Sequence, residues 1–113
     1  MHLPQIRKKL GISGVLTAAY SWRGKFEDDN VQIDLVIDRN DNVINLCEVK
    51  FSSKLYTLKK SDSESLRNKR SAFSGTVQTK KAIITTMITT FGLVRNMYSA
   101  EILSEVELDD FFD

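Results

Sequence analysis

The stretch VQIDLVIDRNDNVINLCEVKF, residues 31–51, predicts two β-strands joined by a hairpin. Apolar residues dominate 31–38 and again 43–51, and the polar residues 39–42 between them are typical of a tight turn. If the loop consists of residues 40–42, Arg39 pairs with Val43. Asn42 then takes the left-handed conformation, which asparagine tolerates better than most residues. This stretch therefore predicts an antiparallel pair of strands with a defined register.

That register decides whether the two carboxylates of the hairpin meet. With the three-residue loop, Asp34 lies opposite Glu48 and Gln32 opposite Lys50. All four share one face, because side chains alternate along a strand. The other face is then apolar, and we expect Cys47 on it to be a core residue rather than a reactive thiol. A loop with an even number of residues would instead put Asp34 and Glu48 on opposite faces.

Two carboxylates inside apolar strands require compensation. An ionised carboxylate is costly to bury unless it is paired or binds a metal, and two of them repel each other. We expect Asp34, Glu48 and the backbone carbonyl of Val49 to bind Mg²⁺, or Mn²⁺ in its place, because hard cations prefer oxygen ligands. Such a metal polarises a phosphodiester and helps generate hydroxide. The predicted catalytic residues are Asp34, Glu48, Lys50, which would orient water or stabilise phosphoryl charge, and Gln32, which would position water or phosphate. The alternative is that Asp34 and Glu48 form structural ion pairs with Lys50 or with helix lysines.

The remaining chain predicts an α/β domain with a mixed sheet in the order α-β-β-β-α-β-β. Ser61 and Glu64 have the spacing of a capping box and indicate the start of the second helix. Leu66, Phe73 and Val77 are its expected buried stripe. We expect a helix at 3–10, strands at 14–22, 31–38, 43–51, 81–90 and within 97–108, and a turn or loop at 23–30.

Charge is distributed unevenly along the chain. The formal net charge is +1, but residues 50–81 contain nine basic and two acidic residues, whereas 82–113 contain one basic and six acidic residues. A basic block beside a carboxylate pair is typical of a protein that binds a polyanion, although a solvated helix face gives the same pattern. The residues expected to contact nucleic-acid phosphates without reading bases are Lys54, Lys59, Lys60, Arg67, Lys69 and Arg70.

Composition excludes several other classes of chemistry. A length of 113 residues suits one domain. A single cysteine and a single histidine, His2, permit neither an internal disulfide nor a structural zinc site, and they make a catalytic triad implausible. The chain has no P-loop and no apolar run long enough to span a bilayer. Low cysteine usage suits a reducing compartment, so we expect a cytoplasmic protein without a membrane partner.

The pieces Ile33-Asp34 and Glu48-Val49-Lys50 resemble the PD-(D/E)XK nuclease superfamily. More narrowly, residues 31–39, 45–51 and 108–112 are similar to the C-terminal domain of a family of bacterial AAA-type ATPases, and the similarity extends over nearly the whole chain. The resemblance implies a restriction-endonuclease-like core and Mg²⁺-dependent hydrolysis of DNA, with RNA the less favoured substrate. It implies an AAA-type ATPase domain as a partner, in cis or in trans. A homo-oligomer of this chain is a further possible assembly.

The resemblance also implies that residues 1–113 are a single nuclease-like domain. This domain is either the C-terminal part of a larger ATPase or truncated at its N-terminus. In similar domains the first helix starts further upstream and often supplies another acidic ligand, whereas no acid precedes Glu27 here. The alternative is a catalytically inactive accessory domain that mediates ATPase docking, oligomerisation or nucleic-acid binding.

Overall fold

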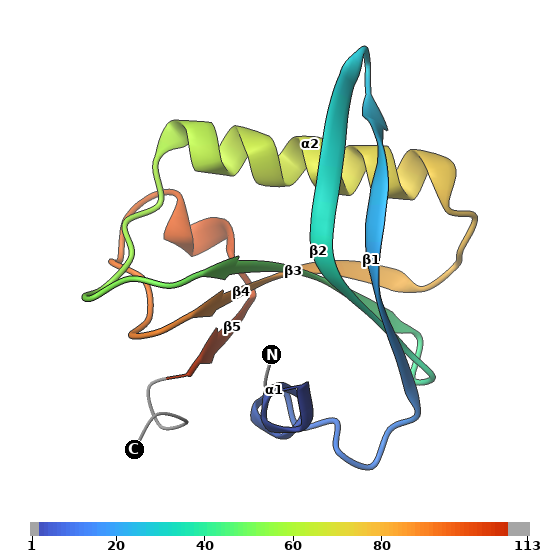
Figure 1. Ribbon diagram of the computed structural model, residues 1–113, viewed down its shortest axis with the longest axis horizontal. Coiled ribbons are helices and arrows are strands. Elements are labelled where there is room, and N and C mark those ends of the chain that lie inside the picture. Colours follow the sequence, from blue (N-terminus) through green and yellow to red (C-terminus); the bar gives the residue numbers. More distant parts are fainter. Residues whose placement is uncertain (1–2, 109–113) are drawn as a thin grey trace.

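Five strands form one mixed sheet in the computed structural model, which describes residues 3–108 (Figure 1). Their order in the sheet follows the chain. The first three are antiparallel neighbours, whereas β4 is parallel to β3 and β5 is parallel to β4. The elements are α1 (Leu3–Lys9), β1 (Thr17–Phe26), β2 (Asp29–Arg39), β3 (Val43–Lys50), α2 (Lys60–Thr76), β4 (Ala82–Thr89), the 3₁₀ helix η1 (Ser99–Glu101) and β5 (Ser104–Glu107). The predicted α/β class and element order are confirmed, and η1 is an addition.

The two helices cover opposite faces of this sheet (Figure 1). On the α1 face, Ile6 packs in a cluster with residues of β2, β3 and β4, among them Leu35 and Cys47. On the α2 face, Phe73 packs with Ile33, Val36, Ile44 and Leu46. Burial of these apolar side chains on both faces stabilises the layers. None of the helices within residues 3–108 is long and apolar enough to cross a membrane.

The β2–β3 hairpin has the predicted register. Asn42 has a φ of 68°, and Leu35 pairs with Cys47 as the three-residue loop requires. Cys47 is 1% exposed, and its burial raises the pKa of the thiol to about 12. The burial confirms the expected place of Cys47 in the core, and the thiol stays protonated at neutral pH.

The β1–β2 hairpin is longer than predicted. Residues 23–30 were expected to form a turn or loop, but β1 continues to Phe26 and β2 begins at Asp29. The figure shows this hairpin extending past α2. Polar side chains predominate here because the end of the hairpin projects beyond the core, so a polar composition did not indicate a loop. Gly24 is required in this segment, because a Cβ there would lie 2.2 Å from the Trp22 ring.

The start of α2 also differs from the prediction. The helix begins at Lys60, and the carboxylate of Asp62 accepts a hydrogen bond from the backbone N–H of Lys59 at 2.9 Å. Asp62 therefore satisfies the N-cap amide, the role that the predicted capping box gave to Glu64. The predicted buried stripe is confirmed: Phe73 is fully buried, and Leu66 and Val77 pack as partly buried residues.

Candidate functional site

Strands β2 and β3 separate where the two predicted carboxylates lie. Their recorded pairing ends at Leu35 and Cys47, although β2 extends back to Asp29 and β3 forward to Lys50. Figure 1 shows β2 leaving the neighbourhood of β3 and passing α2. Asp34 and Glu48 are thus the first residues beyond the last recorded pair, one on each side of a fork between diverging strands.

Glu48 lies on the α2 side of this fork with two lysines around it. Its side chain is 15% exposed, and the Nζ of Lys69 lies 2.8 Å from Oε2. The Nζ of Lys50 lies 3.5 Å from Oε1. Val49 packs into the cluster on the α1 face, so Glu48 and Lys50 share the opposite face, as strand alternation predicts. Each oxygen of the largely buried carboxylate therefore already has a cationic partner, which offsets the cost of burying its charge.

Asp34 is exposed, and Ile33 takes the α2 face on which Glu48 lies, so the predictions that Asp34 is buried and that it shares a face with Glu48 are both wrong. The physical reason is a β-bulge. The pairing of β1 with β2 shifts between Tyr20 and Trp22, which sets Asp34 and Leu35 against Ser21 alone. A bulge places two residues against one and re-aims the side chains beside it. The alternation that was counted along β2 from the hairpin loop is interrupted at this position.

The bulge gives the position facing α2 to Ile33 instead. Ile33 is 2% exposed and packs in the cluster of Phe73, and it lines a small crevice together with Glu48 and Lys69. The Nε2 of Gln32 donates a hydrogen bond to Oδ1 of Asp34 at 3.0 Å. The predicted catalytic residues Gln32 and Asp34 therefore contact each other, whereas within residues 3–108 Glu48 contacts Lys50 and Lys69.

A small cavity beside Glu48 contains an acid that the sequence interpretation missed. It has a volume of about 40 Å³ and is lined by Glu48, Lys50, Asp62, Ser65 and apolar neighbours. Burial and the neighbouring Asp62 raise the pKa of Tyr56. In the sequence, the position of Asp62 at the start of the helix after β3 could have indicated a role at this site. Only the packing of α2 on the sheet places Asp62 and Lys50 in the lining of the same cavity. Within residues 3–108, no group of three or more His, Cys, Asp or Glu residues is arranged to hold a metal ion.

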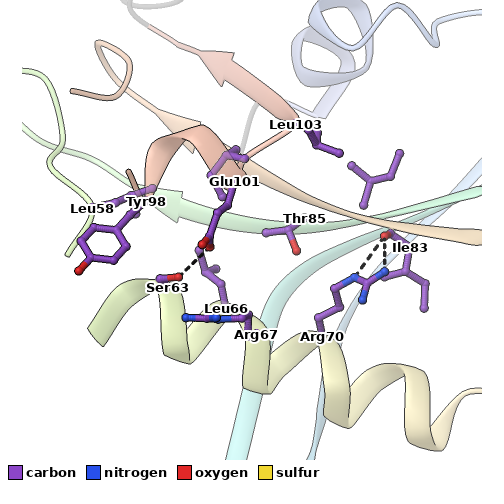
Figure 2. Close-up of a pocket in the computed structure, with 12 residues that line it drawn as sticks. Leu58, Ser63, Leu66, Arg67, Arg70, Ile83, Thr85, Tyr98, Glu101 and Leu103 are labelled. Atoms are coloured by element: carbon purple, nitrogen blue, oxygen red, sulfur yellow. Dashed lines mark hydrogen bonds between the residues drawn. The ribbon is translucent and has the colours of Figure 1, made fainter. Parts of the chain in front are cut away.

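The predicted phosphate-binding residues do not form one surface. Lys69 points to Glu48, whereas Arg67 and Arg70 line a pocket of about 270 Å³ between α2, β4 and η1. Figure 2 shows both arginines at this pocket, where Arg70 donates to the carbonyl of Ile83 at 3.3 and 3.4 Å. In the same view Ser63 donates to Glu101 at 2.9 Å. This pocket shares no residue with the cavity at Glu48 except Leu58 and Leu66 of its apolar wall.

The other three predicted phosphate-binding residues are exposed at the start of α2 and before it. Lys59 and Lys60 lie at the first turn of the helix, and Lys54 lies in the segment that connects β3 to α2. They follow β3 along the chain and so lie after Lys50. These exposed lysines lie before and at the start of α2, whereas Lys50 and Lys69 contact Glu48 itself.

Comparison with known proteins supports the fold class but does not assign the chain to a family. No family model and no curated protein matches the chain. The crystal structure of a protein of unknown function, AF1548, is similar to it with a TM-score of 0.56 at 12% identity. The match covers 85% of this chain and 49% of that chain, so the chain spans about half the length of that protein. At this identity the similarity supports the α/β architecture alone.

Proposed function

We propose that this chain is a restriction-endonuclease-like nuclease domain that hydrolyses DNA phosphodiesters with Mg²⁺. The observation that carries the proposal is the fork between β2 and β3, with Asp34 and Glu48 on its two sides and Lys50 two residues further along β3. Helices on opposite faces of a mixed sheet, in the order α-β-β-β-α-β-β, are compatible with the fold that the sequence resemblance implies.

The donor set at the fork suits a hard cation. Mg²⁺ is usually bound through one or two carboxylates and keeps several waters. Glu48 and the carbonyl of Val49 would hold the ion, and Asp34 would complete the set once its side chain turned towards Glu48 from the face that the bulge gives it. When bound, the ion supplies a polarised phosphodiester and an activated water. Lys50 would stabilise negative charge on the phosphoryl oxygens, and Gln32 would orient Asp34 through the hydrogen bond that already joins them.

Metal-dependent cleavage of DNA tests this proposal directly. Supercoiled plasmid and single-stranded circular DNA are incubated with the protein in Mg²⁺, in Mn²⁺ and in EDTA. We expect cleavage with metal only, and a loss of about 10²-fold or more in Lys50→Ala and Asp34→Ala. Lys8→Ala is the control, because this exposed lysine belongs to α1 on the other face of the sheet. Metal-saturated protein that leaves both DNAs intact would contradict the proposal.

A second candidate is a non-catalytic accessory domain that keeps the nuclease-like fold. The observation that favours it is the pairing of Glu48 with two ammonium groups while Asp34 is exposed with Gln32. In this case the ion pairs of Glu48 are structural. The domain would serve ATPase docking, oligomerisation or nucleic-acid binding, as the same resemblance allows.

Lys69→Gln separates the two candidates. In a metal site the ammonium at 2.8 Å from Glu48 opposes a divalent cation. Its removal should therefore raise Mn²⁺ affinity by about tenfold, measured by calorimetry. In a structural ion pair the same substitution lowers the free energy of unfolding by about 1–3 kcal/mol, because one oxygen of a largely buried carboxylate loses its cation, and it yields no metal binding. Arg67→Gln is the matched control, because Arg67 lines the pocket towards β4 and η1. Absence of Mn²⁺ binding in both the wild type and Lys69→Gln would favour the accessory domain. Mn²⁺ binding that Lys69→Gln leaves unchanged or weakens would contradict the predicted place of the ion beside Glu48.

A further inference from the structure

The pocket of about 270 Å³ between α2, β4 and η1 lies where the sheet is incomplete. Strand β4 begins at Ala82, but β5 pairs with it only from Thr86 onward. Within residues 3–108, residues 82–85 of β4 therefore have no partner strand on the β5 side. Protein interiors leave few voids larger than a water molecule. A hollow of this size between a helix and a sheet is therefore a candidate site for a small ligand.

The wall of this pocket on the side of β4 and η1 is mainly apolar and incompletely covered. Ile83 and Ile84 of β4 line it and are half-buried, as is Ile102 directly after η1. Leu103 lines it as well and is 86% exposed. Water therefore contacts apolar surface that the apolar part of a ligand would cover. Removing such surface from water is favourable, so the wall favours a ligand with an apolar body.

One face of α2 supplies the charged groups of the pocket. Ser63, Arg67 and Arg70 have the spacing of residues on one face of a helix, and all three line the pocket (Figure 2). Arg70 donates to the carbonyl of Ile83 at 3.3 and 3.4 Å, which is long for such a bond. In the described part of the chain, neither arginine lies within salt-bridge distance of a carboxylate. Helix residues three apart are neighbours, so the two guanidinium groups can bind one anion.

Glu101 gives the pocket a direction. Its carboxylate accepts a hydrogen bond from the hydroxyl of Ser63 at 2.9 Å, and Ser63 is only 4% exposed. In Figure 2 this pair lies apart from Arg70 and Ile83. The described residues that line the pocket include two arginines and one glutamate, which gives a formal charge of +1. An anionic group is therefore favoured beside Arg67 and Arg70 and opposed beside Glu101.

We propose that this pocket binds a small amphipathic anion, namely a carboxylate or a phosphate monoester on a short apolar chain. The planar arginine side chain binds two oxygens of either head group at once. The apolar chain would cover Ile83, Ile102 and Leu103, as in other ligand pockets that combine apolar walls with a few polar groups. The pocket shares only Leu58 and Leu66 with the cavity at Glu48, so this inference does not rest on the proposed function.

Calorimetric titrations in EDTA with octyl phosphate, octanoate, octylamine and inorganic phosphate test the proposal. We expect octyl phosphate to bind at least about tenfold more tightly than octylamine or inorganic phosphate. Arg67→Gln and Arg70→Gln should each weaken its binding by about tenfold, the effect of losing a hydrogen bond to a charged group. Leu103→Ala should weaken it by about threefold through lost apolar contact. Arg23→Gln is the matched control, because this exposed arginine of β1 does not line the pocket.

Several results would overturn the proposal. They are octylamine binding as tight as octyl phosphate binding, arginine variants that both bind like the wild type, or no binding of either octyl anion at about 1 mM. Sedimentation with vesicles of anionic phospholipid, without binding of the dissolved anions, would contradict it as well. A preference for octanoate or for octyl phosphate supports the site and identifies its head group. All four substitutions change exposed side chains, so circular-dichroism melts should match the wild type.

Discussion

Glu48→Gln should lower DNA cleavage by about 10²- to 10³-fold, the loss typical of removing one electrostatic group from a site that stabilises developing charge. Glutamine keeps the size of the side chain and can still accept a hydrogen bond from Lys69. It removes the negative charge that Lys50, Lys69 and a divalent cation all require. Mn²⁺ affinity should therefore fall with the cleavage rate. Calorimetry with Mn²⁺ and a cleavage time course measure the two effects on the same preparation.

Glu64→Gln is the control for this substitution. Glu64 is exposed on α2 and makes none of the recorded contacts at Glu48, so the same chemical change should leave cleavage and Mn²⁺ binding unaltered. A Glu48→Gln protein that cleaves DNA at the wild-type rate would exclude Glu48 from the site. A wild type with no activity, together with a Glu48→Gln variant that is only less stable, would favour the accessory domain.

Phe73→Ala should lower the free energy of unfolding by about 3–5 kcal/mol. Phe73 is fully buried in the centre of the cluster on the α2 face. Its ring meets Trp22 edge to face, with a centroid distance of 5.3 Å and an interplanar angle of 71°. Truncation leaves a cavity between α2 and the strands of the fork and removes this aromatic contact. Urea unfolding measured by circular dichroism gives the change directly.

The same residue type at an exposed position provides the control. Phe51→Ala makes an identical chemical change where the side chain is 62% exposed, so we expect a difference in the free energy of unfolding of about 0.5 kcal/mol or less. A loss below about 1 kcal/mol in Phe73→Ala would contradict the packing of α2 on this face, since buried Phe→Ala changes cost several times more. Such a result would also contradict the position of Lys69 beside Glu48, because Lys69 is held there by the packing of α2.

The predictions that succeeded depend on short-range chemistry. The hairpin register followed from the conformational tolerance of Asn42 and from strand alternation between 35 and 47, both of which act within a few residues. The core position of Cys47 and the shared face of Glu48 and Lys50 follow from the same alternation. The stripe of Leu66, Phe73 and Val77 follows from helical periodicity. Each of these features is determined by residues close together in the chain and does not depend on a contact with a distant residue.

The predictions that failed depend on partners that are distant in the chain or on the limits of the core. The bulge that exposes Asp34 arises from the pairing of β2 with β1, and no residue within 31–38 indicates a bulge. The long β1–β2 hairpin is polar because it projects past the core. By composition alone, such a polar hairpin cannot be distinguished from a loop. Arg67 and Lys69 are two residues apart in α2, yet one lines the pocket towards η1 and the other meets Glu48.

The sequence by itself determined the α/β class, the element order, the β2–β3 register and the neighbourhood of Glu48 and Lys50. Local propensity and side-chain periodicity are sufficient for these. Only the tertiary structure decided that Ile33, rather than Asp34, faces α2. It also decided that Lys69 and Asp62 approach Glu48 and Lys50, and that Arg67 and Arg70 line the pocket between α2, β4 and η1. Those outcomes require pairing and packing between segments far apart in the chain, whose geometry is set by the whole sheet.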